Sequence, residues 1–221
     1  MSNKKIPNEE MLDNLRKSLV DANLCGKMSK KRLAHTLEVE KMAERLASLY
    51  APEKTFELRA AALLHDVTKE CSFDEQIRLC AELDIKIGEA EYYAAKTLHA
   101  ITGSKIIAEK YPEFDIEEIR ECVRWHTTGK AGMSLCEKLI YLADYIDMSR
   151  TFEDCVILRA LFFGVDFASM TEDEKLAHLD DTLLVSYDMT IKGLLEKGAP
   201  ISFDTISARN ELAINKIKRR A

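Results

Sequence analysis

The stretch Ala60-Ala61-Ala62-Leu63-Leu64-His65-Asp66 decides the fold of this 221-residue chain. Five small or apolar residues in a row predict a helix that is buried on all sides, because no polar face is left for solvent. The carboxylate of Asp66, at the end of such a helix, is costly to bury unless a cation neutralises it. The stretch therefore predicts a helical core with a charged, paired group inside it.

The whole chain has the pattern of an all-α protein. Only four prolines and eight glycines interrupt it, and its apolar residues recur at helical spacing. Helices are expected at residues 8–23, 29–50, 55–67, 72–84, 88–97, 100–110, 115–126, 134–147, 153–163 and 172–197. The length predicts a single domain over residues 1–221, with a core at about 29–150 and a helical C-terminal extension at 151–221.

Composition excludes several classes of protein. The net charge of -6 argues against duplex nucleic acid as a partner, because proteins that bind it usually present a basic face. No apolar run approaches the roughly 18 residues of a membrane span. The cysteines contain no Cys-x-x-Cys pair, and no signal segment opens the chain, so we expect reduced thiols in a cytoplasmic protein. The cysteines are Cys25, Cys71, Cys80, Cys122, Cys136 and Cys155.

Two histidines lie on the apolar faces of predicted helices. Val39, Met42 and Leu46 follow His35 at four, seven and eleven residues, which places His35 on an inward face. His126 stands in the same relation to the apolar residues before it, whereas His178 falls on a polar face. A buried neutral imidazole needs either a metal ion or a hydrogen-bond partner, and both remain open for these two residues.

A metal site explains the buried charges better than four separate core residues do. His65 and Asp66 can reach one ion together near a helix end, and Asp144 lies in the apolar helix Leu139–Ile146, which has no other reason to hold a charge. Nitrogen and oxygen ligands suit iron, manganese, zinc or cobalt. Lys69 follows Asp66 by three residues, on the same side of any continuing helix, and we predict that it neutralises charge on a leaving phosphate.

These residues resemble the H…HD…D signature of the HD-domain metal-dependent phosphohydrolases. More specifically, the flanking segments resemble the YqeK-type family of bacterial symmetrical bis(5'-nucleosyl)-tetraphosphatases. The segments that carry this resemblance are Leu63–Lys69, Leu98–Ala100, Trp125–Met133, Tyr141–Ile146 and Asp204–Asn210. The resemblance covers about residues 10–215 and implies a helical bundle-like HD domain with a metal site between its core helices.

The resemblance also implies roles for individual residues. Iron would be held by His35, His65, Asp66 and Asp144, with manganese, zinc or cobalt as alternatives, and Asp66 and Lys69 would be the catalytic residues. His99 and His126 would contact phosphate, or would bind a second metal, a question that stays open. The remaining expected substrate contacts are Arg32, Thr127, Arg150, Thr205 and Arg209.

The implied activity is hydrolysis of dinucleoside polyphosphates by metal-activated water, with diadenosine tetraphosphate split symmetrically into two ADP. The partner would be a small nucleotide substrate, with neither nucleic acid nor membrane, and a homodimer stays open. Two alternatives remain. One is another HD phosphohydrolase, acting as a nucleotide phosphatase or alarmone hydrolase, and the other is a helical module that binds nucleotides without catalysis.

Overall fold

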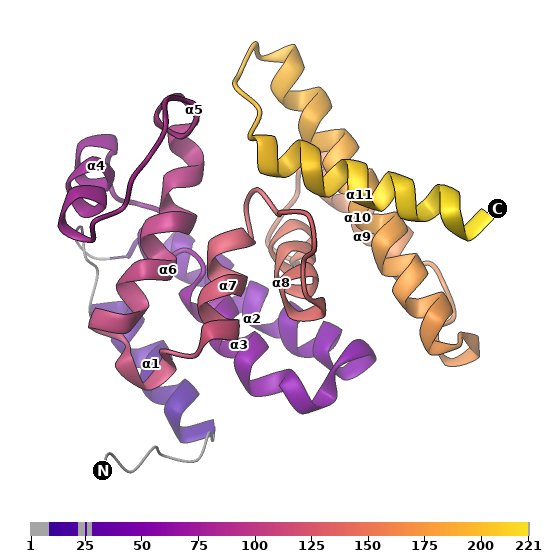
Figure 1. The fold of residues 1–221 in the computed structure, drawn as a ribbon. Coiled ribbons are helices and arrows are strands. Elements are labelled where there is room, and N and C mark those ends of the chain that lie inside the picture. The colour runs from indigo at the N-terminus through magenta and orange to yellow at the C-terminus, as the bar shows by residue number, and fades with distance from the viewer. Residues whose placement is uncertain (1–8, 22–24, 26–27, 221) are drawn as a thin grey trace.

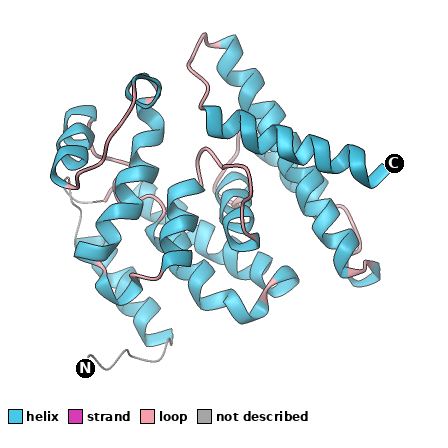
Figure 2. Cartoon of the chain, viewed as in Figure 1, coloured by secondary structure: helices cyan, strands magenta, loops and turns pink. Residues whose placement is uncertain are grey.

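A computed structural model of the protein describes residues 9–21, 25 and 28–220, and every regular element among them is helical (Figures 1 and 2). The α-helices are α1 (Glu9–Asp21), α2 (Lys30–Tyr50), α3 (Thr55–Leu64), α4 (Phe73–Glu82), α5 (Glu89–Tyr93), α6 (Leu98–Lys110), α7 (Glu117–Trp125), α8 (Leu135–Ile146), α9 (Glu153–Phe163), α10 (Glu172–Glu196) and α11 (Phe203–Arg220). The short 3-10 turns are η1 (Pro52–Lys54), η2 (Ala95–Thr97), η3 (Pro112–Phe114) and η4 (Phe167–Ser169). The all-α prediction is confirmed.

Helix α3 is the buried helix that the opening stretch predicts. Its residues Leu58 and Ala60 to Leu64 are all 0% exposed. It packs chiefly against α2, and also against α7 and α8, so that apolar neighbours surround it. In Figure 1, α2 and α3 lie behind α7 and α8, while α9, α10 and α11 form a separate layer at the C-terminal side.

Helix starts follow the capping chemistry of the sequence. The side chains of Ser134 and Thr171 each accept a hydrogen bond from the backbone amide three residues later. The carboxylates of Glu137 and Glu174 in turn accept a hydrogen bond from the backbone amide of the capping residue. The helix ends agree less well with the sequence pattern. Helix α3 stops at Leu64, three residues early, and the segment expected at 88–97 is divided into α5 and η2.

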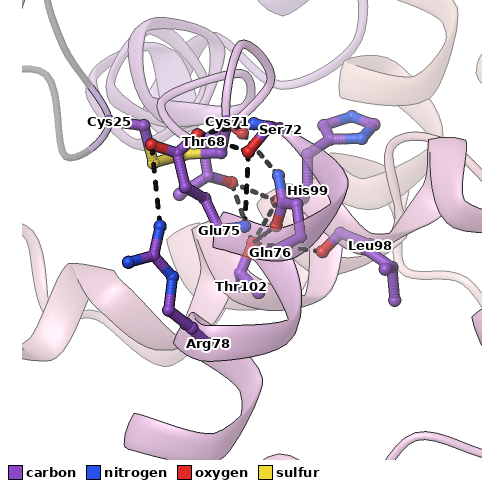
Figure 3. The surroundings of a disulfide bond; sticks show 10 residues. All are labelled: Cys25, Thr68, Cys71, Ser72, Glu75, Gln76, Arg78, Leu98, His99 and Thr102. Carbon is purple, nitrogen blue, oxygen red and sulfur yellow. Dashed lines mark hydrogen bonds and ion pairs between the residues drawn. A yellow bond between two sulfur atoms is a disulfide. The ribbon is translucent and has the colours of Figure 1, made fainter.

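Contacts with other helices explain why α3 ends early. After Leu64 the backbone forms successive tight turns, in which the amides of Val67, Lys69 and Cys71 each donate to the carbonyl three residues earlier. Gln76 donates to the carbonyl of Thr68 at 2.5 Å, and the Thr68 hydroxyl donates to the carbonyl of His99 at 2.9 Å. These bonds, drawn in Figure 3, stabilise a turn where periodicity alone predicts more helix.

The C-terminal part differs from expectation in two further places. Helix α11 was not among the helices predicted individually, although the extension was expected to be helical. His178 was expected on a polar face, but its ring stacks on Phe162 at 5.4 Å between centroids and its Nε2 hydrogen bonds to the carbonyl of that residue. Residues 8, 22 and 23 of the first predicted helix lie outside the described residues.

The expectation that all cysteines are reduced is wrong for two of them. Cys25 and Cys71 form a disulfide, whereas the other four cysteines are free and buried. Figure 3 shows the bond beside the start of α4, next to the turn that follows Asp66. The sequence did not indicate this pair, because 46 positions separate the two residues and only the fold places their Cα atoms 5.2 Å apart.

Substitution of Cys71 by serine tests this crosslink. A disulfide that spans 46 residues of sequence is expected to stabilise the folded state by about 4 kcal/mol, on a chain-entropy estimate. Urea denaturation of oxidised wild type and of Cys71→Ser should differ by about this amount. Reductant should destabilise the wild type and leave the variant unchanged. Equal stability before reduction would contradict the crosslink.

None of the helices in the described ranges combines the length and the apolar composition that a membrane span requires.

Candidate metal centre

The four predicted metal ligands meet at one place, although they come from three helices. His35 projects from α2, His65 and Asp66 follow the last residue of α3, and Asp144 lies in the last turn of α8. His35 Nε2 lies 3.0 Å from Asp144 Oδ1, and His65 Nε2 lies 3.2 Å from Asp66 Oδ2. The distance from His65 Nε2 to Asp144 Oδ1 is 3.6 Å. The fold therefore gathers two imidazoles and two carboxylates around a common point.

The donor atoms of this cluster fit a metal ion. His65 is fully buried, and its Nδ1 donates a hydrogen bond to the carbonyl of Ala62 at 2.6 Å. This leaves Nε2 as the ring nitrogen that can coordinate a metal ion. Among the described residues, Nε2 of His35 and Nε2 of His65 are buried and have no hydrogen-bond partner of good geometry. Buried polar atoms rarely remain unpaired, so these two nitrogens are suited to coordinate a cation. Candidate ligand atoms of His35, His65 and Asp144 all lie within 4.8 Å of one another.

His99 and His126 form the second half of the site. Both are 2% exposed, so the predicted inward direction of His126 is confirmed. Their Nε2 atoms lie 3.0 Å apart, and each Nδ1 is bonded to a backbone carbonyl three residues earlier. Asp66 joins the two halves, because its Oδ2 faces His65 whereas its Oδ1 lies 3.2 Å from His99 Nε2 and 3.6 Å from His126 Nε2.

Three cations surround the carboxylates. Arg32 forms an ion pair with Asp66, and Arg150 forms one with Asp144. Lys69 differs from both arginines, because its Nζ lies against the ring of His99, at 3.1 and 3.3 Å from the two ring nitrogens. The predicted positive charges are therefore gathered beside the predicted ligands.

The other predicted substrate contacts divide into two groups. The hydroxyl of Thr127 lies 2.9 Å from His126 Nε2 and 3.2 Å from His99 Nε2, within the centre. Thr205 instead donates to the carbonyl of Thr128, and Arg209 forms an ion pair with Asp188. Neither Thr205 nor Arg209 makes a hydrogen bond or an ion pair with the His/Asp cluster, and their role in substrate binding stays a prediction.

One buried carboxylate of the centre was absent from the sequence-based set. Asp147 is 0% exposed, and its Oδ2 lies 3.4 Å from His35 Nδ1 and 3.2 Å from Arg150 Nε. A signal for it was present in the sequence, because Asp147 follows Asp144 by three residues at the end of the same apolar helix.

The charges of the centre shift the pKa values of its ligands. Burial disfavours the protonated ring of His65, but the carboxylates of Asp66 and Asp144 outweigh burial and raise the pKa of His65 to about 10. Burial also opposes ionisation of Asp66, yet chiefly the charge of the His65 ring holds the pKa of Asp66 well below its usual value. Against the same burial, chiefly Arg150 holds the pKa of Asp144 well below its usual value.

The second pair of histidines behaves differently. Burial lowers the pKa of His99 to about 4 and also lowers the pKa of His126, despite their contacts with Asp66. Both rings are therefore neutral at neutral pH, and each presents an unprotonated Nε2 because Nδ1 donates to a carbonyl. A neutral Nε2 can bind a metal ion or accept a proton.

Metal binding should release a proton from this site. In the metal-free protein His65 is protonated at neutral pH, since its pKa is raised to about 10, and a metal ion can bind Nε2 only after that proton leaves. Affinity for Mn²⁺ is therefore expected to fall about tenfold for each unit by which pH drops below that value. Calorimetry at pH 8 in two buffers of different ionisation enthalpy would count the protons. A count of zero would contradict the raised pKa.

Comparisons with known proteins agree with this geometry. The family model described as "HD domain" matches residues 32–149, which include all four predicted metal ligands. This is just over half of the chain, and the chain belongs to the HD-domain proteins, as its all-helical fold and His/Asp centre indicate.

Similar proteins narrow the class. The chain is 31% identical to the symmetrical bis(5'-nucleosyl)-tetraphosphatase of Halalkalibacterium halodurans, over 86% of this chain and 92% of that protein. The enzyme of the same name from Bacillus subtilis is 31% identical over 84% of this chain and 91% of its own length. The crystal structure of a predicted HD superfamily hydrolase from Clostridium acetobutylicum, described as involved in NAD metabolism, is also similar. Its TM-score is 0.76 at 34% identity, over 92% of this chain and 97% of that one. Within the HD-domain proteins, the chain belongs to the family of symmetrical bis(5'-nucleosyl)-tetraphosphatases.

Proposed function

We propose that this protein is a metal-dependent phosphohydrolase that cleaves dinucleoside tetraphosphates, diadenosine tetraphosphate above all, into two nucleoside diphosphates. The observation that carries the proposal is the convergence of His35, His65, Asp66 and Asp144, with two buried Nε2 atoms that have no hydrogen-bond partner of good geometry in the described part of the chain. Relatives that the chain matches over most of their length carry the name of this activity. The preference for adenine rests on the resemblance alone.

The four residues of this cluster would hold one divalent cation. We propose iron, as the resemblance to the family implies. Two imidazoles and two carboxylates offer nitrogen and oxygen donors, which suit manganese, zinc and cobalt as well. When bound, such a cation lowers the pKa of water and thereby supplies hydroxide at neutral pH. His99 and His126 contact phosphate in this proposal. The position of Asp66 between both histidine pairs also supports the alternative of a second cation.

The cations of the chain position the polyphosphate. Arg32 and Arg150 pair with Asp66 and Asp144, and the hydroxyl of Thr127 lies beside His126. These positions next to the proposed metal site support a role of the three side chains in binding phosphate oxygens. In the reaction, hydroxide forms a bond to one inner phosphorus while the bridging bond between the second and third phosphates breaks. Lys69 would stabilise the negative charge on the leaving diphosphate.

We also propose that residues 1–221 form a single HD domain, with its core at about 29–150 and a helical extension at 151–221. The contacts of α8 with α9 and α10 support this arrangement, because they join the extension to the helix that carries Asp144. The cytoplasmic location and the homodimer stay predictions.

An anaerobic assay with Fe²⁺ and diadenosine tetraphosphate tests the activity. ADP is expected as the only nucleotide product, and ¹⁸O from labelled water should appear in one of the two ADP molecules formed in each turnover. Release of ATP and AMP instead would show asymmetric cleavage. Absence of any ADP, with the metal bound, would overturn the proposed substrate.

A further inference from the structure

The turn that follows α8 carries a carboxylate that the metal centre does not use as a ligand. Asp147 is completely buried, which is rare for a carboxylate. Its Oδ1 accepts hydrogen bonds from the backbone amide of Ser149 at 2.8 Å and from the hydroxyl of that residue. Its Oδ2 has no hydrogen bond of good geometry in the described part of the chain.

The free oxygen of Asp147 faces two groups of the centre. Oδ2 lies 3.4 Å from His35 Nδ1 and 3.2 Å from Arg150 Nε. On the other side of the imidazole ring, His35 Nε2 faces Asp144 Oδ1 at 3.0 Å. The ring of His35 therefore lies between Asp147, whose carboxylate can accept a hydrogen bond from Nδ1–H, and Asp144, whose carboxylate would share the proposed cation with Nε2.

A residue of the C-terminal extension fixes the turn that carries Asp147. Arg159 of α9 donates to the carbonyl of Ile146 at 2.7 Å, to that of Arg150 at 2.8 Å, and to that of Asp147. Three carbonyls at the end of α8 are thus bound by one guanidinium, which holds the turn in a single conformation. A fixed turn is what a carboxylate needs if it is to orient a neighbouring ring.

We propose that Asp147 is a positioning residue of the metal centre, which keeps the proton of His35 on Nδ1 and so presents Nε2 to the metal. A histidine that binds a metal commonly donates its other ring N–H to a carboxylate, which sets the tautomer and the ring orientation. The same oxygen of Asp147 contacts Arg150 Nε, so it also directs that guanidinium toward Asp144. This inference rests on the metal centre of the proposed function but does not depend on the identity of the substrate.

Metal affinity of the metal-free protein, measured by titration with Co²⁺ and its visible absorption, tests the proposal without any substrate. Asp147→Ala is expected to weaken Co²⁺ binding about 10–100-fold. Asp147→Asn keeps an acceptor oxygen in the same volume, and it should recover part of that loss. Long-range ¹H–¹⁵N spectra of the imidazoles should show His35 protonated at Nδ1 in the wild type and a mixture of tautomers in Asp147→Ala.

Two further variants distinguish positioning from general stabilisation. Glu40 is a carboxylate on the same helix as His35, is 5% exposed, and pairs with Arg16 and Arg59 outside the centre. Glu40→Gln should lower Tm without changing Co²⁺ affinity. Ser149→Ala removes the hydroxyl that lies 3.2 Å from His35 Nδ1 and should change affinity less than Asp147→Ala does.

The proposal is overturned if Asp147→Ala and Asp147→Asn bind Co²⁺ as tightly as the wild type, whatever their Tm. It is also overturned if Ser149→Ala alone reproduces the loss, because the hydroxyl would then be the group that orients His35. If neither substitution of Asp147 yields a folded protein, the residue is structural and the proposal fails. Failure of the substrate assay, in contrast, would leave the Co²⁺ result unaffected.

Discussion

Asp66→Ala is expected to remove metal binding and to lower kcat by at least about 10³-fold, which corresponds to about 4 kcal/mol of transition-state stabilisation. The reason is the position of Asp66 between both histidine pairs. One oxygen lies 3.2 Å from His65 Nε2 and the other lies 3.2 Å from His99 Nε2, so a single substitution removes a ligand and the counter-charge of the whole centre. Metal analysis after purification without chelator, together with the ADP assay, measures both effects.

A matched control separates this effect from the loss of a buried carboxylate in general. Glu137 is 3% exposed, pairs with Lys130 and caps α8, but it contacts none of the proposed ligands. Glu137→Gln should keep metal content and turnover near those of the wild type. Far-UV circular dichroism should show that Asp66→Ala remains helical. Full metal content in Asp66→Ala would rule out its role as a ligand.

Lys69→Met is expected to lower kcat about 10²–10³-fold without changing metal affinity. In other enzymes, loss of a hydrogen-bond donor directed at the charge that develops in the transition state lowers kcat by a factor of this size. Lys69 is a half-buried cation whose nearest partner is the ring of His99, not a carboxylate. Burial lowers the pKa of Lys69, although the charges of Asp66 and Asp144 oppose this shift. Its ammonium makes no ion pair with a carboxylate among the described residues and can therefore approach a leaving group, whereas the two arginines also neutralise Asp66 and Asp144.

Lys41→Met is the control, because Lys41 is exposed and pairs with Glu38 one helical turn away, outside the metal centre. Steady-state kinetics of both variants at saturating metal would give kcat and KM separately. A kcat of Lys69→Met within threefold of that of the wild type would contradict a catalytic role. An equal loss of metal affinity would instead assign Lys69 to the structure of the centre.

The metal site could be predicted because its proposed ligands include carboxylates in apolar segments, where burial of an unpaired charge costs free energy. A carboxylate after Ala60 to Leu64, and another inside the apolar helix of Asp144, violate the rule that buried segments are uncharged. Such violations indicate function, since only a compensating cation makes them stable. His35 and His126 were placed correctly for a simpler reason, because helical periodicity determines which face is buried.

Other features depended on contacts that no local pattern contains. The end of α3 at Leu64 depends on hydrogen bonds from Gln76 and Thr68 to backbone carbonyls. The disulfide partner of Cys71 depends on the approach of a segment 46 residues away. Thr205 and Arg209 lie in a segment that resembles the family, yet their side chains bind Thr128 and Asp188. Short motifs report residue identity, not the direction in which a side chain points.

From the sequence alone we could infer that this protein is helical, that His35 and His126 face inward, and that His35, His65, Asp66 and Asp144 belong to one charged cluster. Tertiary structure alone decided how these residues share their contacts: Asp66 faces both histidine pairs, the arginines neutralise the carboxylates, and Asp147 lies against His35. The difference arises because these effects act over different distances along the chain. Periodicity and burial cost act within one helix, whereas ion pairs and ring orientation depend on atoms that meet only when helices distant in sequence pack together.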